Sequence, residues 1–321
     1  MNGLNRKNRM DSLKAHFGSA GMGLGAVFFL VAATVSPCLG ADGAGVETGE
    51  MLSLFSPARP AALSAFTAVG SGISGMSFNP AALASQKSPA VSGTYLDWIE
   101  DSRVGELRVA LPCPVGCPVG ALGASFGAFQ AGDIEVEEES GLVDKKPAQD
   151  DYLVSLGFGS GLPMGVSLGG AVKWYRSTLL SQFTDSTVLA DAGMMWRSPG
   201  RDLALGVALK NMGRGLKYLD TRVPFHSVLT AGVSWNVFSL ESLLAVADIS
   251  FSRDEQRFVS GGVEWELFRM LALRCGTLSS EYMQTVSGGV GLRYGKIQFD
   301  YAMVIPKGLA HTSRASLTLW M

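Results

Sequence analysis

The stretch Asp202-Leu203-Ala204-Leu205-Gly206-Val207-Ala208-Leu209-Lys210 decides the fold, because large apolar residues alternate in it with alanine or glycine. Successive side chains of a β-strand point to opposite faces, so the alternation predicts a strand with one apolar face and one small face. The same pattern recurs from Val91 to Trp320. Its runs of roughly ten residues are longer than usual globular strands and match tilted strands that cross a bilayer.

Fourteen segments of this kind follow residue 89. They start near Val91, Val104, Val119, Asp151, Met164, Thr187, Asp202, Ser227, Ser242, Arg257, Met270, Thr285, Lys296 and His311. An even number of strands suits a single-chain antiparallel barrel, in which the last strand pairs with the first. We therefore expect an all-β fold, a transmembrane antiparallel β-barrel of about fourteen strands over residues 90–321, preceded by an N-terminal hatch.

The connections between these segments alternate in length. Residues 131–150 and 211–226 form long connections and residues 177–186 an intermediate one, whereas the intervening turns are short. Long loops at one end and short turns at the other are typical of outer-membrane barrels. Apolar Leu317, Leu319 and Met321 end the chain and resemble the terminal signal of such proteins, which predicts the outer-membrane assembly machinery as a partner.

The N-terminus has the features of a secretory signal peptide over residues 1–40. Basic residues precede an apolar stretch of 14 residues, Met22–Val35, and small residues follow at 36–41. The stretch is too short for a membrane helix, so export to the cell outer membrane is expected. Acylation of Cys38 is the alternative interpretation of this region.

The composition excludes several functions. Charged residues make up 17% of the chain and its net charge is −2, with basic residues scattered, so no nucleic-acid partner is expected. Cys113 and Cys117 either form a small disulfide or stay reduced, and their spacing does not indicate a metal site. We expect no cofactor and no metal. The 40 glycines are expected to thin the inner face of the barrel and leave space inside it.

Charged residues within the strands are expected to face the lumen, because charges on the lipid side are costly. The candidate lumen or ligand-binding residues are Lys173, Asp191, Asp248, Glu264, Arg274 and Arg293. The alternative interpretation is that such charges pair with one another and brace the wall or a plug.

Residues 41–89 lack a sustained strand pattern and predict a separate segment with a short helix over Pro60–Val69. The segment ends in a Gly/Ser/Ala-rich run and Asn79-Pro80-Ala81. With this motif, the strand count and the signal peptide, the chain resembles the FadL-type long-chain fatty-acid transporters of outer membranes. It resembles still more closely an uncharacterised spirochaete family related to them and the PorV/PorQ group.

The resemblance implies that residues 41–89 form a hatch in the periplasmic mouth, with Asn79, Pro80 and Ala81 as its motif. It implies passive uptake of hydrophobic small molecules, such as long-chain fatty acids or other lipids, through a hatch-gated lumen. Outer-membrane lipid and a hydrophobic ligand are then the expected partners. The outer loops are shorter than those of typical members of the fatty-acid transporter family, which predicts a reduced external capture groove.

Two other kinds of function are compatible with a β-barrel. A structural or interaction barrel would dock a secretion or surface partner through its outer loops, for example through the acidic run with Glu135 and Glu137–Glu139 before Lys145-Lys146; a solvated charge run is the simpler interpretation. An enzyme would need a site such as His226 near Asp220, but no G-x-S-x-G nucleophile motif is present, so catalysis is not expected.

Overall fold

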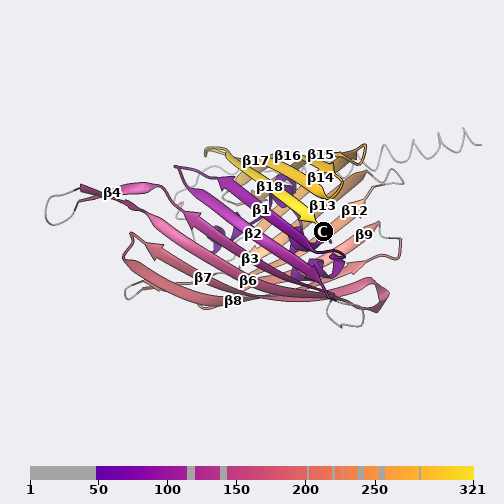
Figure 1. Ribbon diagram of the computed structural model, residues 1–321, viewed down its shortest axis with the longest axis horizontal. Coiled ribbons are helices and arrows are strands. Elements are labelled where there is room, and N and C mark those ends of the chain that lie inside the picture. Colours follow the sequence, from indigo (N-terminus) through magenta and orange to yellow (C-terminus); the bar gives the residue numbers. More distant parts are fainter. Residues whose placement is uncertain are drawn as a thin grey trace, which may run out of the picture. The chain divides into compact units, whose positions relative to one another are not determined.

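The computed structural model describes residues 48–113, 120–137, 143–200, 202–218, 221–225, 227–237, 242–252, 257–281 and 283–321. The expected signal peptide, the Cys113–Cys117 pairing and the His226–Asp220 pair lie outside these residues. Within them, fourteen antiparallel strands form one closed barrel in which the first strand, β1, pairs with the last, β18 (Figure 1). The predicted barrel is therefore confirmed.

The barrel strands, in chain order, are β1 (Ala90–Asp97), β2 (Arg103–Pro112), β3 (Ala121–Gln130), β6 (Gln149–Gly161), β7 (Val166–Leu179), β8 (Phe183–Arg197), β9 (Leu203–Gly213), β12 (Val228–Asn236), β13 (Leu243–Ser252), β14 (Arg257–Leu267), β15 (Leu271–Ser280), β16 (Gln284–Tyr294), β17 (Ile297–Pro306) and β18 (Thr312–Trp320). Each begins within four residues of its predicted start.

The two ends of the barrel differ. One end, called the loop end, carries the hairpins β4–β5 (Asp133–Glu137 and Val143–Pro147) and β10–β11 (Leu216–Tyr218 and Thr221–Val223). The other, called the turn end, has short connections, such as the one containing the 3-10 turn η3 (Pro163–Gly165). The predicted loop 177–186 is wrong: Ser177, Asp185 and their neighbours continue the β7–β8 ladder, because polar side chains there bond across it, as Thr178 does with Thr184 at 3.0 Å.

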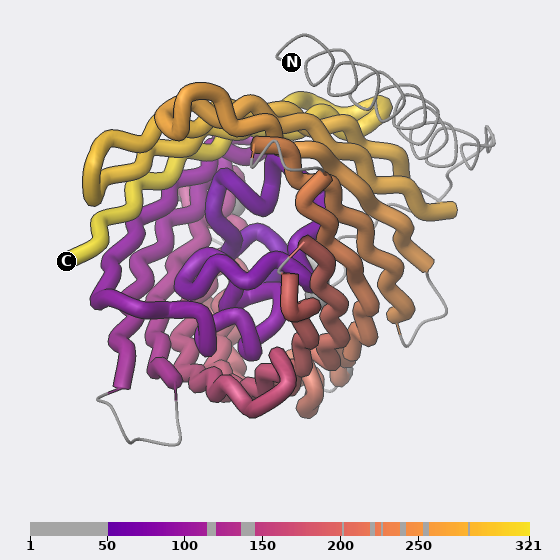
Figure 2. The backbone as a smooth tube through the Cα atoms, turned by 90° about the vertical axis from the view of Figure 1, so that its right-hand side faces the viewer, coloured from indigo at the N-terminus to yellow at the C-terminus, as the bar shows by residue number. Residues whose placement is uncertain are grey.

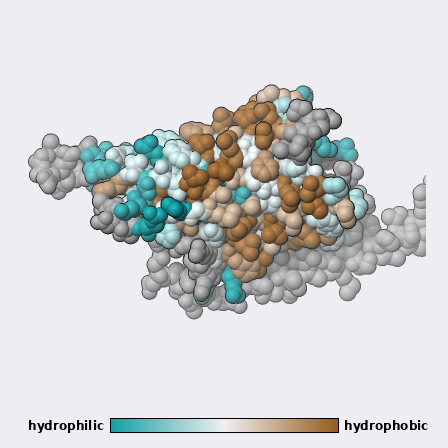
Figure 3. Space-filling model, turned by 90° about the horizontal axis from the view of Figure 1, so that it is seen from below, coloured by the Kyte–Doolittle hydropathy of each residue, from teal (hydrophilic) through white to brown (hydrophobic). Residues whose placement is uncertain are grey.

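The outer wall is apolar. Large apolar side chains occupy the outward positions, and many are about half exposed, as in Leu107 (52%), Leu156 (63%) and Val286 (61%). Figure 3 shows a broad hydrophobic surface over the barrel, with hydrophilic residues gathered at the end that carries the β4–β5 hairpin. An apolar band of this kind faces hydrocarbon, so the protein has the surface of an outer-membrane barrel.

Residues 48–89, called the inner segment, lie inside the ring of strands, as the view from the turn end shows (Figure 2). They form α2 (Thr48–Leu54), α3 (Ala58–Leu63) and the 3-10 turns η1 (Gly72–Gly75) and η2 (Pro80–Ser85). The helix predicted over Pro60–Val69 is shorter and earlier, because Ser64 adopts a left-handed conformation with φ 59° and ends α3. None of the described helices combines the length and apolar character required to cross a membrane.

Inward-facing glycines let the inner segment lie directly against the wall. A Cβ added at Gly169 would overlap the backbone of Pro80 and Ala81, and one at Gly193 would overlap the side chain of Asn79. Gly169 and Gly193 are direct partners in the β7–β8 ladder. The expectation that the glycines leave empty space in the lumen is therefore wrong here: the missing Cβ atoms admit the backbone of the inner segment.

We predict that Gly193→Ala destabilises the barrel by about 1–3 kcal/mol, because the added methyl group must displace Asn79 or bend β8. Gly105→Ala is the matched control, since a Cβ at this outward position of β2 meets no atom within 4 Å. Urea unfolding of the refolded protein in lipid bilayers measures both. Equal stability of the two variants would contradict the close approach.

Candidate functional site: the inner segment, the lumen charges and the apolar cluster

Asn79 fastens the inner segment to the wall. Its side chain is fully buried, and its Nδ2 lies 3.0 Å from the carbonyl oxygen of Thr67, 3.1 Å from that of Met194 and 3.3 Å from that of Val207. Its Oδ1 accepts the amide N–H of Ala81 at 3.0 Å and so caps η2. Because Met194 and Val207 are partners in β8 and β9, one side chain joins the segment to two strands.

Lys173 and Asp191 form a buried ion pair of 2.5 Å between β7 and β8. Lys173 also donates to Oδ1 of Asn211 at 2.9 Å, and Asp191 accepts the backbone N–H of Asn211 at 2.8 Å. The β8–β9 register shifts by one residue beside Asp191. A bulge of this kind changes the local direction of the strand, and here it turns the backbone N–H of Asn211 toward the carboxylate of Asp191.

Asp248 and Glu264 bind the inner segment directly. Oδ2 of Asp248 accepts the amide N–H groups of Phe66 at 2.8 Å and Thr67 at 3.0 Å. Glu264 accepts two hydrogen bonds from Arg59 of α3, at 2.8 and 2.7 Å. Partial burial lowers the pKa of the Arg59 guanidinium, but the charge of Glu264 and these hydrogen bonds outweigh it and raise that pKa above its ordinary value.

Arg274 links Glu264 to a second carboxylate. It donates to Glu264 at 2.5 Å and to Asp300 at 2.7 Å. Glu264 is thus shared by two guanidinium groups, one from the wall and one from the inner segment. Arg293 lies farther toward the turn end, exposed, with its guanidinium 4.9 Å from the ring centre of Trp320.

An apolar cluster fills the lumen toward the loop end. From the wall it contains inward-facing residues in the loop-end halves of neighbouring strands: Leu96, Val104, Phe129, Leu153, Tyr175 and Leu189. From the inner segment it contains Met51, Leu52 and Phe55. Leu216 of the β10–β11 hairpin and Phe225 beyond it complete the cluster. Apolar side chains therefore line much of this part of the barrel, beside inward polar residues such as Asp151, Ser177 and Thr187.

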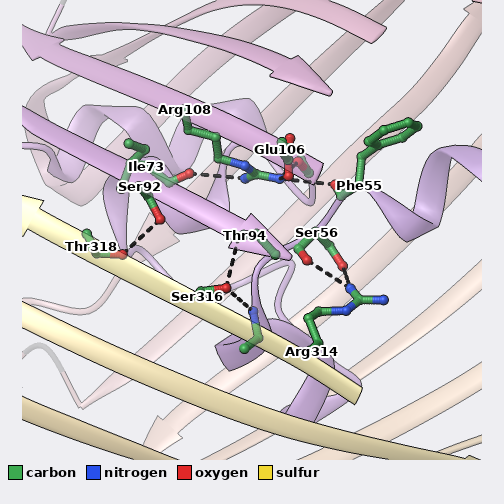
Figure 4. Close-up of polar contacts among 12 residues, drawn as sticks. Phe55, Ser56, Ile73, Ser92, Thr94, Glu106, Arg108, Arg314, Ser316 and Thr318 are labelled. Carbon is green, nitrogen blue, oxygen red and sulfur yellow. Dashed lines mark hydrogen bonds and ion pairs between the residues drawn. The ribbon is translucent and has the colours of Figure 1, made fainter. Parts of the chain in front are cut away.

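Arg314 lies at the edge of this cluster, since its direct partner in the β1–β18 ladder is Leu96. Its Nη1 donates to the carbonyl oxygen and the hydroxyl oxygen of Ser56, and its Nε has no partner among the described residues. The neighbouring Arg108 donates to Phe55 O at 3.0 Å, Ile73 O at 3.3 Å and Glu106 at 2.8 Å (Figure 4). Of these two buried guanidinium groups, that of Arg108 pairs with a carboxylate, whereas that of Arg314 donates to Ser56 alone among the described residues.

Of the predicted lumen residues, Lys173, Asp191, Asp248, Glu264 and Arg274 face inward and are buried, whereas Arg293 is exposed at the turn end. Glu264 and Arg274 form an ion-pair network with Arg59, and Lys173 pairs with Asp191. Asp248 accepts hydrogen bonds from the backbone of the inner segment. Their role toward a ligand stays a prediction. Sequence analysis missed Glu106, Arg108 and Arg314, although their inward positions in β2 and β18 follow from the same alternation.

Other candidate features give little support to different chemistry. Among the described residues, no three His, Cys, Asp or Glu side chains gather in a way that could hold a metal. In the β4–β5 hairpin Glu135 lies opposite Lys145, with an exposed ion pair of 3.7 Å, so part of the acidic run is paired across the hairpin. His311 is exposed in the connection before β18.

Comparisons with known proteins identify the fold. Neither the protein-family models nor the curated proteins gave a match. Among solved structures, the Ralstonia pickettii toluene transporter TbuX aligns with a TM-score of 0.57 and 14% identity over 83% of this chain and 97% of its own. The CymD monoaromatic hydrocarbon channel aligns with a TM-score of 0.56 and 12% identity over 79% of this chain and 94% of its own. A Pseudomonas aeruginosa FadL homologue aligns with a TM-score of 0.54 and 11% identity over 82% of this chain and 98% of its own.

These likenesses show that the chain shares the barrel fold of FadL-type outer-membrane proteins. The expected closer relationship to the spirochaete and PorV/PorQ families stays a prediction.

We predict that Asn79→Asp destabilises the protein more than Asn79→Ala does. The alanine variant loses the hydrogen bonds of a buried amide, at a cost of about 1–3 kcal/mol. The aspartate variant also turns a second acceptor toward the three carbonyl oxygens that Nδ2 contacts. Urea midpoints measured for the two variants in the same bilayer compare them; a more stable aspartate variant would contradict the assigned orientation of the amide.

Proposed function

We propose that the protein is a passive outer-membrane transporter for hydrophobic molecules with an anionic head group, such as long-chain fatty acids, and that the inner segment is its hatch. The observation that carries this proposal is the apolar cluster in the lumen with the incompletely paired cation Arg314 at its edge. An apolar wall suits an aliphatic tail, and a guanidinium suits a carboxylate.

The apolar cluster argues against an aqueous pore. Water-filled barrels have polar interiors, whereas Leu96, Val104 and Phe129 present apolar side chains to this lumen. Met51 and Leu52 of α2 belong to the cluster. Displacement of α2 would expose an apolar surface of the kind that an alkyl chain covers, so α2 holds the place of a ligand.

Arg314 favours an anionic ligand over a neutral one. An arginine keeps its charge in a protein, and a buried charge without a partner is costly. The nearby carboxylate of Glu106 pairs with Arg108, and Arg314 has no ion pair among the described residues. A ligand carboxylate would supply the missing negative charge. TbuX and CymD are named for neutral aromatic hydrocarbons, and such ligands would leave Arg314 unpaired.

Asp151 borders the same cluster from β6 and does not reverse this preference. Its Oδ2 accepts hydrogen bonds from Tyr175 at 2.6 Å and Gln149 at 2.7 Å. A buried carboxyl group can also become neutral by binding a proton, which an arginine cannot do by losing one. The alternative of a partner-docking barrel is less favoured, since the acidic hairpin pairs part of its charge internally.

We predict that Arg314→Gln weakens binding of a fluorescent long-chain fatty acid by about tenfold, because a charged hydrogen-bonded pair contributes roughly 1.5–3 kcal/mol. Binding of the matching fluorescent alcohol should change little. Arg257→Gln, an exposed arginine at the loop end of β14, is the control. Equal loss of acid and alcohol binding would argue against recognition of the head group by Arg314.

Gating by the hatch is tested with a reversible tether. The hydroxyl oxygens of Ser64 and Ser287 lie 2.9 Å apart, between the end of α3 and β16. In a background without native cysteines, Ser64→Cys with Ser287→Cys should block fatty-acid uptake into vesicles when oxidised and restore it on reduction. The control pair, Ser92→Cys with Thr318→Cys, tethers two wall strands whose hydroxyls are also 2.9 Å apart. Full uptake with the oxidised segment tether would contradict a moving hatch.

A further inference from the structure

A hollow of about 80 Å³ at the turn end brings the inner segment and the wall together around charged groups. It is partly open to solvent, and its lining includes Arg59, Arg269, Arg274, Arg293, Glu264 and Glu266. The volume is room for one small oxyanion or a few waters, since a water occupies about 30 Å³ of liquid. The hollow lies away from the apolar cluster, at the opposite end of the barrel.

The hollow contains both paired and unpaired charges. Glu264 is divided between Arg59 and Arg274, and Arg274 also pairs with Asp300. The guanidinium of Arg293 has no hydrogen-bond or ion-pair partner among the described residues and stacks on Trp320. A guanidinium without a carboxylate partner therefore lies at a place that water reaches.

We propose that this hollow is a binding site for a carboxylate or phosphate group, received by Arg293 and Arg59, and that the bound anion loosens the ion pair between Arg59 and Glu264. Arginine is suited to this role because its planar fork binds an oxyanion with two parallel hydrogen bonds. Stacking on Trp320 holds the Arg293 fork in place before the anion arrives.

Through Arg59, an anion bound in the hollow can change the contacts of the inner segment. It belongs to α3, and its side chain is 21% exposed, so an anion in the hollow reaches it from solvent. An anion that binds Arg59 competes with Glu264, which keeps Arg274 as its cation. Arg274 in turn keeps Asp300. The ion pairs within the wall therefore remain intact when Arg59 leaves Glu264.

The exchange would couple an anion at the turn end to movement of α3. This coupling rests on the proposed function, in which the segment moves to let a ligand leave. Binding of the anion itself does not rest on it. If the protein binds phosphate through Arg293 but transports nothing, the anion site is supported and only the proposed uptake function is contradicted.

Two probes distinguish the source of the anion, measured by titration calorimetry on the purified protein in a non-ionic detergent. Inorganic phosphate is too polar for the apolar cluster and reports the hollow, whereas decanoate represents an amphiphile head group, with decanol as its neutral control. Arg293→Gln should weaken phosphate binding by about tenfold, and Arg293→Lys by less, because lysine keeps the charge but loses the fork. Arg257→Gln should bind as the wild type does.

Hydrogen exchange measures the coupling. Saturating anion should speed exchange at the α3 amides of Ala61 and Ser64, which bond within that helix, in the wild type but not in Arg293→Gln. Glu264→Gln should bind phosphate more tightly, since one competing carboxylate is neutralised.

Binding of phosphate that depends on Arg293 supports a site for free anions. Decanoate binding that depends on Arg293, without phosphate binding, supports a site for head groups. The proposal is overturned if neither anion needs Arg293, or if bound anion leaves exchange in α3 unchanged.

Discussion

The close approach of the inner segment to the inward-facing glycines is the constraint on which the rest of the structure depends. Side chains at Gly169 or Gly193 would hold Pro80 and Asn79 away from the wall. Only at this short separation can the side chain of Asn79 reach carbonyl groups of β8 and β9. The glycines thus decide where the segment lies, and its position decides which lumen charges find partners.

Burial of charge in this lumen follows from that placement. A carboxylate in a low-dielectric interior needs donors, and the inner segment supplies them as backbone N–H groups to Asp248 and as the guanidinium of Arg59 to Glu264. The converse holds for Arg108 of the wall, which donates to the carbonyl groups of Phe55 and Ile73 in the inner segment. The segment and the wall therefore supply hydrogen-bond partners to each other's buried polar groups, and neither would have these partners alone.

The alternation of residues predicted the strands and their faces because each face depends only on local parity. Lys173 and Asp248 could be placed inward in this way, and so could Arg314, although it was overlooked. Parity does not predict partners: Arg59 and Glu264 are 205 positions apart. It also cannot tell an empty lumen from a filled one, since glycine at position 169 is compatible with both. Helix α2 was missed because Thr48–Leu54 follows a glycine-rich stretch and gains its order from the apolar cluster.

The contacts of the inner segment divide it into an anchor and an arm. Around η2, Asn79 and the glycine row form an anchor, in which separation would break buried hydrogen bonds and open closely packed backbone. The arm, α2 and α3, is held by contacts of several kinds. Apolar contacts that an alkyl chain can replace hold α2. Ion pairs and hydroxyl contacts that an anion and water can replace hold α3, together with the close approach of the Leu63 backbone to Gly262 and Gly276. A ligand with an aliphatic tail and an anionic head offers both replacements. We infer that such a ligand moves the arm past the fixed anchor, so that the barrel need not expel its hatch to let a molecule through.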